Sequence, residues 1–495
     1  MLAMRLTCQL KAHVRGDGVR TLTTGFALAC AVVSVSCVSG DVGPINELVS
    51  TVGRDSEEFI PEASDDGSTV VGLAFSGGGT RTAAFSYGVL RELDEIVIDT
   101  QPERRTLLDD IRMISGASGG AVTATYFGYK GKDGYHDLRE RFLVKDAEAY
   151  LRKRFSPINL ARAYNGGVND RRGFPRWLDE NLFDGATFAS LDRSDAPVVW
   201  INASDIFNRT PFLFTYDTFA ALCSDLDKVR LSDAVAASAA VPVAFSPLVV
   251  SAAEPNCNYT RPKWLANALE APEASMRLRS YARALEGYQK TDDLDYVKLL
   301  DGGLTDNIGV TGFTIERLSA QTPYGPLSPA GAVKLRKFIF VVADAGQSTT
   351  PDWGETVGGP KVATLLNAVT GTTISALVRN EFDALKLAMD NWKGELVRYR
   401  CGLSLGEVRK LRGSLAGWNC RDVELVIELV SFHDVDANMR ARLNYVPTRL
   451  KLPVAEVDLT IEAGRLALRN NRNLAKAVAE IQRYAGVSGQ LAAAD

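Results

Sequence analysis

A serine set among glycines has the residue types and spacing that nucleophilic catalysis requires. Residues 112–126 begin with a short apolar run, continue as Gly116-Ala117-Ser118-Gly119-Gly120 and then carry small residues with helical spacing. A strand, a G-x-S-x-G turn and a helix in this order make a nucleophile elbow, in which the glycines remove side chains that would clash around a strained serine. Ser118 would then stand at a helix N-terminus, where N–H groups and the helix dipole favour negative charge. The same pattern also fits a glycine-rich helix start without chemistry.

Three successive glycines, Gly77, Gly78 and Gly79, follow another apolar run. Their bare backbone N–H groups can bind a phosphate or form an oxyanion hole, with Gly119 as a further candidate donor. The sequence has neither the P-loop spacing nor a G-x-G-x-x-G fingerprint here, which disfavours nucleotide binding. Arg81, at the start of the next predicted helix, can fix the glycine loop, pair with an anionic substrate group or form a structural salt bridge.

A serine hydroxyl needs a base to take its proton as it attacks. Asp301 ends a short apolar run and precedes Gly302 and Gly303, which allow a sharp turn toward the serine. A solvated aspartate, with a pKa of about 3.9, is a poor base at neutral pH, but burial raises the pKa toward useful values. The sequence therefore predicts Ser118 as nucleophile and Asp301 as general base.

The elements that position these groups follow from the hydrophobic pattern. Continuous apolar runs, typical of strands buried on both faces, alternate with helical patterns. We expect an α/β fold with a mostly parallel central sheet flanked by helices, and with functional residues at the carboxyl ends of its strands. The strongest strand predictions fall at residues 69–75, 197–203 and 337–343.

The chain of 495 residues has room for several segments. We expect an export segment over 1–37 and a tether over 38–66. A catalytic α/β domain follows over 67–345, with an insertion around 252–296. The region over 346–495 is expected to be mainly helical, with a strand near residues 423–432, and to pack on the catalytic domain.

The N-terminus resembles an export signal. Arg15 and Arg20 precede an apolar run over residues 21–36, which Cys37 follows. Cys37 resembles the lipidated cysteine of bacterial lipoproteins, although Ser34 stands where leucine is usual. A plain signal peptide and a single membrane anchor are the alternatives. We expect an exported protein of the cell envelope, anchored in a membrane on the periplasmic side or in the outer membrane.

Charge and cysteine content narrow the functional classes. Lys and Arg number 56 against 60 Asp and Glu, and no basic block stands out, so nucleic-acid binding is not expected. The three histidines have no metal-ligand spacing, and we expect no metal site. Four cysteines lie beyond the expected export segment. In an oxidising compartment they either form disulfides, with Cys223–Cys257 and Cys401–Cys420 as our prediction, or stay free and buried.

Four blocks in a fixed order resemble the patatin-like phospholipase family. They are the glycine loop with its arginine, the G-x-S-x-G block, a small-residue and proline block and the D-G-G block, at residues 77–81, 116–120, 236–247 and 301–303. The resemblance implies a histidine-free Ser118–Asp301 dyad that hydrolyses acyl esters of lipids at a membrane surface. It also implies an oxyanion hole in the glycine loop and no cofactor.

Two other functions fit parts of the sequence. The chain order Ser118, Asp301, His433 matches the triad order of an ordinary α/β-hydrolase. A lipid-anchored envelope protein that binds lipid without turnover is the second alternative. The sequence does not distinguish among phospholipid, lysophospholipid, neutral acylglycerol and acyl-thioester substrates.

Overall fold

The computed structural model describes residues 43–52, 60, 66–101, 103–151, 159, 164, 167–252, 257–290, 294–347, 357–359 and 361–485. The predicted export segment and Cys37 lie outside these residues. Residues 43–52, which the sequence places in a tether, are hydrogen-bonded to the folded part: the N–H of Ile45 donates to the carbonyl oxygen of Val249 at 2.9 Å, and that of Val49 to Cys223 at 2.8 Å.

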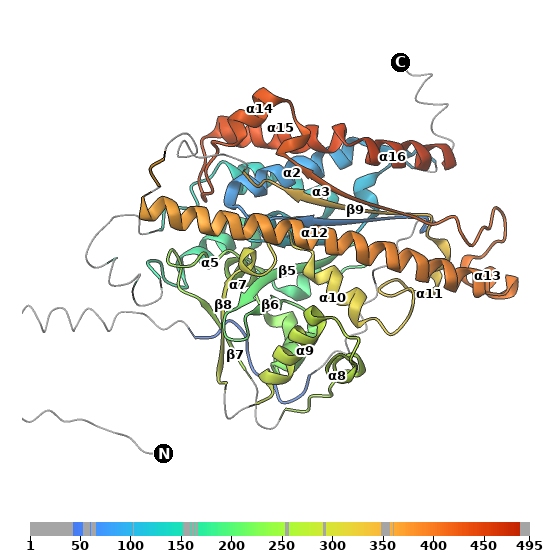
Figure 1. The fold of residues 1–495 in the computed structure, drawn as a ribbon, viewed down its shortest axis with the longest axis horizontal. Helices are drawn as coiled ribbons and strands as arrows, with labels where there is room; N and C mark the ends of the chain where they lie inside the picture. The colour runs from blue at the N-terminus through green and yellow to red at the C-terminus, as the bar shows by residue number, and fades with distance from the viewer. Residues whose placement is uncertain are drawn as a thin grey trace, which may run out of the picture. The chain divides into compact units, whose positions relative to one another are not determined.

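An eight-stranded sheet forms the centre of the molecule, in the order β10-β9-β1-β4-β5-β8-β7, with β6 paired to β5 (Figure 1). Strands β10, β9, β1, β4 and β5 are parallel, whereas β6 and β8 run antiparallel to β5. The sheet is therefore mixed and mostly parallel, as expected. Its strands are β1 (Thr69–Phe75), β4 (Ile111–Ala117), β5 (Val198–Asp205), β6 (Thr210–Leu213), β7 (Leu248–Ser251), β8 (Tyr296–Asp301), β9 (Lys337–Asp344) and β10 (Glu424–Ser431), with a separate pair β2 (Val97–Asp99) and β3 (Arg105–Thr106).

Helices cover both faces of this sheet, because the strands alternate their side chains between two apolar layers. Along β9, for example, Ile339 and Val341 face one layer, and Phe338 and Phe340 face the other. The helices are α2 (Gly79–Glu95), α3 (Gly119–Gly134), α5 (Gly173–Leu178), α6 (Tyr216–Ala221), α7 (Leu231–Ser238), α8 (Lys263–Glu270), α9 (Met276–Tyr288), α10 (Thr311–Ser319), α11 (Pro329–Lys334), α12 (Val362–Gly402), α13 (Leu405–Arg412), α14 (Ala437–Leu443), α15 (Val454–Asn470) and α16 (Arg472–Tyr484).

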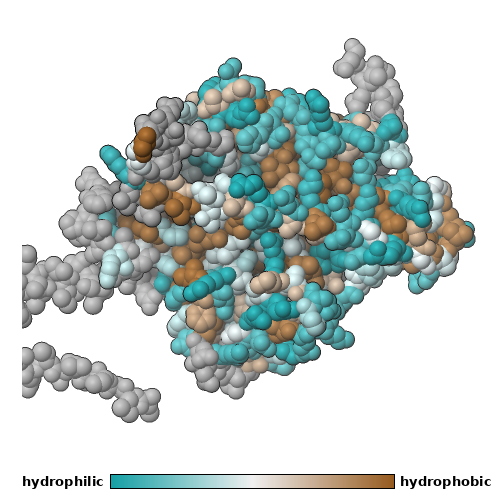
Figure 2. Space-filling view, in the orientation of Figure 1, coloured by the Kyte–Doolittle hydropathy of each residue, from teal (hydrophilic) through white to brown (hydrophobic). Residues whose placement is uncertain are grey.

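The C-terminal region is built into the same sheet. Its strand β10 pairs in parallel with β9 over eight residues, from Glu424 opposite Lys337 to Ser431 opposite Asp344. Helix α15 packs so closely on α2 that a Cβ on Gly88 would lie 2.0 Å from the carbonyl oxygen of Ile461. Helix α12 crosses the other face (Figure 1), where its Trp392 packs against Phe338. Hydrophilic and hydrophobic residues are interspersed over the surface on this side (Figure 2).

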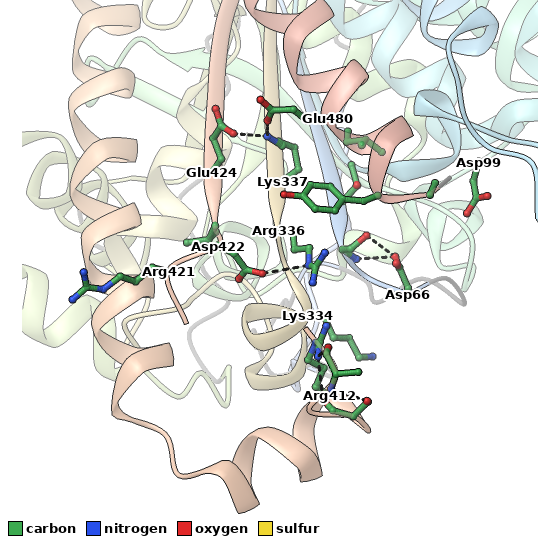
Figure 3. A pocket seen from close by; sticks show the side chains of 18 of the residues that line it. Asp66, Asp99, Lys334, Arg336, Lys337, Arg412, Arg421, Asp422, Glu424 and Glu480 are labelled. Atoms are coloured by element: carbon green, nitrogen blue, oxygen red, sulfur yellow. Dashed lines mark hydrogen bonds and ion pairs between the residues drawn. The ribbon is translucent and has the colours of Figure 1, made fainter. Parts of the chain in front are cut away.

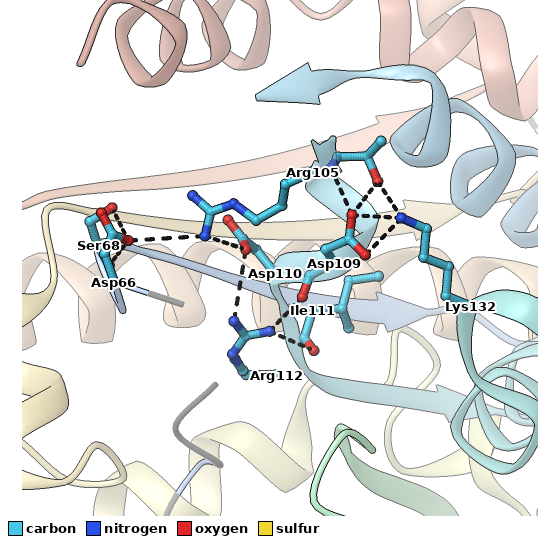
Figure 4. Close-up of polar contacts among 9 residues, drawn as sticks. Asp66, Ser68, Arg105, Asp109, Asp110, Ile111, Arg112 and Lys132 are labelled. Atoms are coloured by element: carbon cyan, nitrogen blue, oxygen red, sulfur yellow. Dashed lines mark hydrogen bonds and ion pairs between the residues drawn. The ribbon is translucent and has the colours of Figure 1, made fainter. Parts of the chain in front are cut away.

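A buried charge cluster fixes the start of β4, the strand that leads to Ser118. The side chain of Asp110 is fully buried, and its Oδ1 lies 3.4 Å from Arg105 Nη1 and 3.7 Å from Arg112 Nη2. Figure 4 shows both guanidinium groups directed at this carboxylate. A buried carboxylate needs such partners, because an uncompensated charge away from water is costly.

Both predicted disulfides are present. Cys223 is bonded to Cys257, and Cys401 is bonded to Cys420. The second bond joins the end of α12 to the segment before β10, and so links the long helix covalently to the edge of the sheet.

Candidate active site

Ser118 occupies the tight turn between β4 and α3. Its φ of 52° and ψ of −119° lie in a region that residues with a side chain rarely adopt, and it is the N-cap of α3. The flanking glycines make the turn possible: a Cβ on Gly116 would lie 2.5 Å from the carbonyl carbon of Gly120, and a Cβ on Gly120 would lie 2.4 Å from the carbonyl oxygen of Phe75. The sequence pattern thus produces the strained elbow geometry.

Asp301 approaches Ser118 from the end of β8, an antiparallel neighbour of β5. Because β8 is antiparallel to β5, Asp301 pairs with Ala203, next to Asn202, which pairs with Ala117 at the end of β4. Asp301 therefore ends its strand, as expected, and that strand is an antiparallel member of the mostly parallel sheet. The strand starts beyond the carboxyl end of β5 and runs back toward the serine.

The environment of Asp301 changes its acidity. Burial raises the pKa of Asp301 to about 6, and hydrogen bonds from the Gly303 N–H and the Ser118 hydroxyl partly offset that rise. The Gly303 bond is 2.8 Å long. Asp301 is therefore ionised at neutral pH, yet is a stronger base than a solvated aspartate.

Of the three N–H groups expected to form an oxyanion hole, those of Gly78 and Gly79 remain candidates. The N–H of Gly77 donates to the carbonyl oxygen of Asn307 at 2.8 Å, which corrects the expectation that Gly77 is an oxyanion donor. Gly78 and Gly79 have φ of 143° and 64°, and their N–H groups donate no hydrogen bond within the described part of the chain. Gly119 lies against this loop, since a Cβ on it would be 2.0 Å from the carbonyl oxygen of Gly79. The N-termini of α2 and α3 thus meet beside Ser118.

Arg81 holds the glycine loop to the C-terminal part of the chain. Its side chain is buried, and it donates from Nε to the carbonyl oxygen of Ala345 at 3.0 Å and from Nη1 to that of Val446 at 2.8 Å. Burial lowers the pKa of Arg81 to about 10, and the carboxylate of Asp344 opposes this effect. Of the three roles considered for Arg81, the geometry fits the first, in which it fixes the loop.

Several residues that the sequence analysis did not single out hold the dyad in place. The Ser238 hydroxyl, at the end of α7, accepts the N–H of Ser118 at 2.8 Å and donates to the carbonyl oxygen of Asn202. The Ser204 hydroxyl donates to the carbonyl oxygen of Asp301 at 2.8 Å. Ser238 lies in the small-residue block, which was the only sequence signal for it; Asn202 and Ser204 had none beyond their place on a buried strand.

His433 lies at a different part of the sheet edge. It is exposed in the turn after β10, and β9 and β1 lie between β10 and β4. At the usual spacing of neighbouring strands, three steps separate β10 from β4 by about 14 Å. The structure brings Asp301 to Ser118 and does not bring His433 there.

A hydrophobic rim borders the dyad. It consists of Val241, Val243 and Leu304, whose exposed fractions are 43%, 64% and 43%. Val241 follows Ala240, whose carbonyl oxygen accepts the N–H of Asp301 at 2.9 Å. Val243 has a φ of 70°, which is unusual for a β-branched residue. All three residues are close in the chain to Asp301 or to its partner Ala240, and such exposed apolar residues suit an apolar ligand.

A cavity of about 690 Å³ lies elsewhere, at the start of β1, β9 and β10 (Figure 3). Thr69, Lys337 and Glu424 line it, so it is at the opposite sheet edge from Ser118. Charged side chains pair with one another across it, as Lys337 does with Glu424 and Glu480. Within the described ranges no cluster of three metal-binding side chains occurs, and no helix there has the length and apolar character to span a membrane.

Comparison with known proteins gives the following matches. Residues 73–314 match the family model described as patatin-like phospholipase. None of the curated proteins matches the chain. Among solved structures, human GIVD cytosolic phospholipase A2 is similar with 13% sequence identity and a TM-score of 0.39, over 85% of this chain and 64% of that one. The chain therefore covers less than two thirds of the length of that protein.

Replacing Gly119 by alanine tests the contact between the two helix N-termini. The new methyl group would lie 2.0 Å from the carbonyl oxygen of Gly79, so the glycine loop or α3 must move. We expect Gly119→Ala to destabilise the protein by about 2 kcal/mol, measured by urea unfolding.

The matched control is Gly371→Ala, in α12. Gly371 is exposed and nothing lies within 4 Å of its Cβ position. Since alanine is the better helix former, this change should stabilise the protein by up to about 1 kcal/mol. Equal unfolding midpoints for the two variants would contradict the proposed contact.

Proposed function

Because this chain belongs to the patatin-like phospholipase family, a family of serine hydrolases, we propose that it hydrolyses acyl esters of lipids through a covalent acyl-enzyme on Ser118. The observation that carries the proposal is the contact between the Ser118 hydroxyl and the buried carboxylate of Asp301. The serine has a base, the base has a raised pKa, and His433 lies at another part of the sheet edge.

In the acylation step, Ser118 Oγ attacks the ester carbonyl carbon while its proton passes to Asp301. The carbonyl oxygen becomes an oxyanion, and we expect the N–H groups of Gly78, Gly79 and Gly119 to donate to it. In support, the N–H groups of Gly78 and Gly79 donate to no other group among the described residues. Each such donor is worth about 3–4 kcal/mol in the transition state. When the tetrahedral intermediate collapses, Asp301 gives the proton to the leaving alcohol.

The deacylation step reverses these roles. Asp301 takes a proton from water as the water oxygen attacks the acyl carbon, and the intermediate releases the fatty acid while Ser118 Oγ recovers the proton. The N-terminal ends of α2 and α3, which meet at the site, add the favourable field of their dipoles to both oxyanions. This chemistry requires neither a metal ion nor a cofactor.

The hydrophobic rim supports a lipid substrate. Val241, Val243 and Leu304 expose apolar surface beside the dyad, where the acyl chain of a lipid can leave the bilayer and gain contact. We further propose export and envelope anchoring through Cys37, which the sequence before the folded part suggests. The two disulfides support an oxidising compartment.

Fluorophosphonate labelling tests the dyad directly. We expect the wild-type protein to label, and Ser118→Ala to abolish both labelling and ester hydrolysis. Asp301→Asn should lower hydrolysis by at least about 10³-fold, because the serine loses its base. His433→Ala is the matched control and should keep wild-type rates.

Two outcomes would contradict the assignment: activity that survives in Ser118→Ala, or activity that is lost in His433→Ala. A wild-type protein that binds lipid vesicles but never labels would favour the binding protein without turnover.

The pH dependence follows from the raised pKa of Asp301. Only the ionised carboxylate can accept the serine proton, and its fraction falls about tenfold for each pH unit below a pKa of about 6. We expect kcat/KM on a soluble ester to fall with that slope below pH 6 and to be level above pH 7. A rate that stays level down to pH 4.5 would contradict a buried aspartate base.

Val243→Asn tests the hydrophobic rim. Asparagine tolerates a φ of 70° better than valine, so we expect unchanged or higher thermal stability. Because the variant exposes a polar amide to the bilayer, hydrolysis of phospholipid vesicles should fall about tenfold, whereas hydrolysis of a short soluble ester should change less than twofold.

The control is Val369→Asn, which alters an equally exposed valine on α12. It should leave both activities at the wild-type level. Equal losses on vesicles and on the soluble ester in Val243→Asn would exclude a lipid-contact role for the rim.

A further inference from the structure

A loop of the C-terminal region lies directly against the glycine loop. This 446–451 loop connects α14 to α15. The carbonyl oxygen of Arg449 accepts the N–H of Thr80 at 2.8 Å, and a Cβ on Gly79 would lie only 2.6 Å from the same oxygen. A shift of Arg449 away from the site would therefore release the backbone of Gly79, one of the candidate oxyanion donors.

Glu148, which follows α3 in the chain, binds the 446–451 loop through three hydrogen bonds. Its Oε1 accepts Nε of Arg449 at 3.1 Å and the N–H of Leu450 at 3.0 Å, and its Oε2 accepts Nη2 of Arg449 at 2.6 Å. A carboxylate that receives two N–H groups of one guanidinium fixes the orientation of that group as well as its distance. Glu148 thus holds the side chain of Arg449 and the backbone directly after the carbonyl that Thr80 uses.

Asp146 supports this arrangement from the same turn. Its Oδ2 lies 2.5 Å from Nζ of Lys451, and its Oδ1 accepts the N–H of Glu148 at 3.1 Å. The first contact holds the end of the 446–451 loop, and the second fixes the backbone of Glu148 itself. The loop is therefore bound at two places to a segment that lies outside the C-terminal region.

The two partners of the central ion pair are buried to different extents. The side chain of Glu148 is only 7% exposed, whereas that of Arg449 is 53% exposed. A buried carboxylate depends on its partners, but an arginine that loses Glu148 can move into water at small cost. Removal of the glutamate should therefore release the loop while most of the folding stability is kept.

We propose that Glu148 is a positioning residue for the reaction: through Arg449 and the N–H of Leu450 it holds the 446–451 loop against Gly79 and Thr80. It thereby sets where the N–H groups of the glycine loop point. Glu148 lies within the matched residues 73–314, and Arg449 lies beyond them. A segment outside the family match thus contributes to the geometry of the oxyanion site.

This inference rests on the proposed function, and its experiment separates the two. Wild type, Glu148→Ala and Glu148→Gln are compared by kcat and KM on a soluble ester and by amide hydrogen exchange at Thr80. We expect Glu148→Ala to lower kcat about tenfold, because a misplaced donor fails the oxyanion of the transition state, and to change KM less than twofold. Exchange at Thr80 should become faster. Glu148→Gln keeps the shape and an acceptor oxygen, so its kcat should stay within about threefold of wild type.

Asp458→Ala is the matched control. Asp458 of α15 accepts Nε and Nη2 of Arg139 at 2.8 and 3.0 Å, so this pair also joins the segment after α3 to the C-terminal region with two hydrogen bonds. Asp458 is not part of the 446–451 loop. We expect Asp458→Ala to keep the wild-type kcat and the wild-type exchange at Thr80.

Wild-type kcat in Glu148→Ala would overturn the inference, as would an equal loss of kcat in Asp458→Ala. If Glu148→Ala does not fold, Arg449→Met takes its place, since it keeps the length of the side chain and removes two of the three hydrogen bonds. Wild-type kcat in that variant overturns the inference equally. If the wild type hydrolyses no ester, the proposed function fails. In that case faster exchange at Thr80 in Glu148→Ala than in Asp458→Ala supports the positioning role, and equal exchange excludes it.

Discussion

The backbone contact between Gly79 and Gly119 is the constraint on which the rest of the site depends. It brings the N-terminal ends of α2 and α3 together beside Ser118, at a separation that a side chain on Gly119 would not allow. In the described part of the chain, the N–H groups of Gly78 and Gly79 in this region donate to no other group. A helix N-terminus alone favours an anion only modestly, whereas two that converge with fixed donors can stabilise an oxyanion in the transition state.

Parts of the chain far from the reacting groups maintain this approach. The N–H of Thr80 donates to the carbonyl oxygen of Arg449 at 2.8 Å, and Arg81 binds the carbonyl oxygens of Ala345 and Val446. Helix α15 packs on α2 at backbone contact through Gly88. The C-terminal region, which we expected as a mainly helical region packed on the catalytic domain, therefore contacts the glycine loop directly.

Burial sets the acidity of the candidate base, Asp301, whereas the contacts above set the position of the glycine loop. The pKa of Asp301 rises because apolar strands and α7 exclude water from it, and the Ser204 and Gly303 hydrogen bonds fix its position. Ser118 itself has a positive φ, which is a strained conformation for a residue with a side chain. Strain and buried charge both cost stability, and a rigid sheet with helices on both faces provides the stability to hold them.

The sequence alone determined the fold class and predicted the candidate reacting groups Ser118 and Asp301. Glycine spacing around Ser118 and after Asp301, and the continuous apolar runs of the strands, are local signals that can be read from residue types. The direction of β8, the use of the Gly77 N–H by Asn307, and the places of Ser238 and Arg449 could be seen only in the tertiary structure. These features depend on contacts between residues distant in the chain, and their partners, such as a backbone carbonyl, leave no pattern in the sequence.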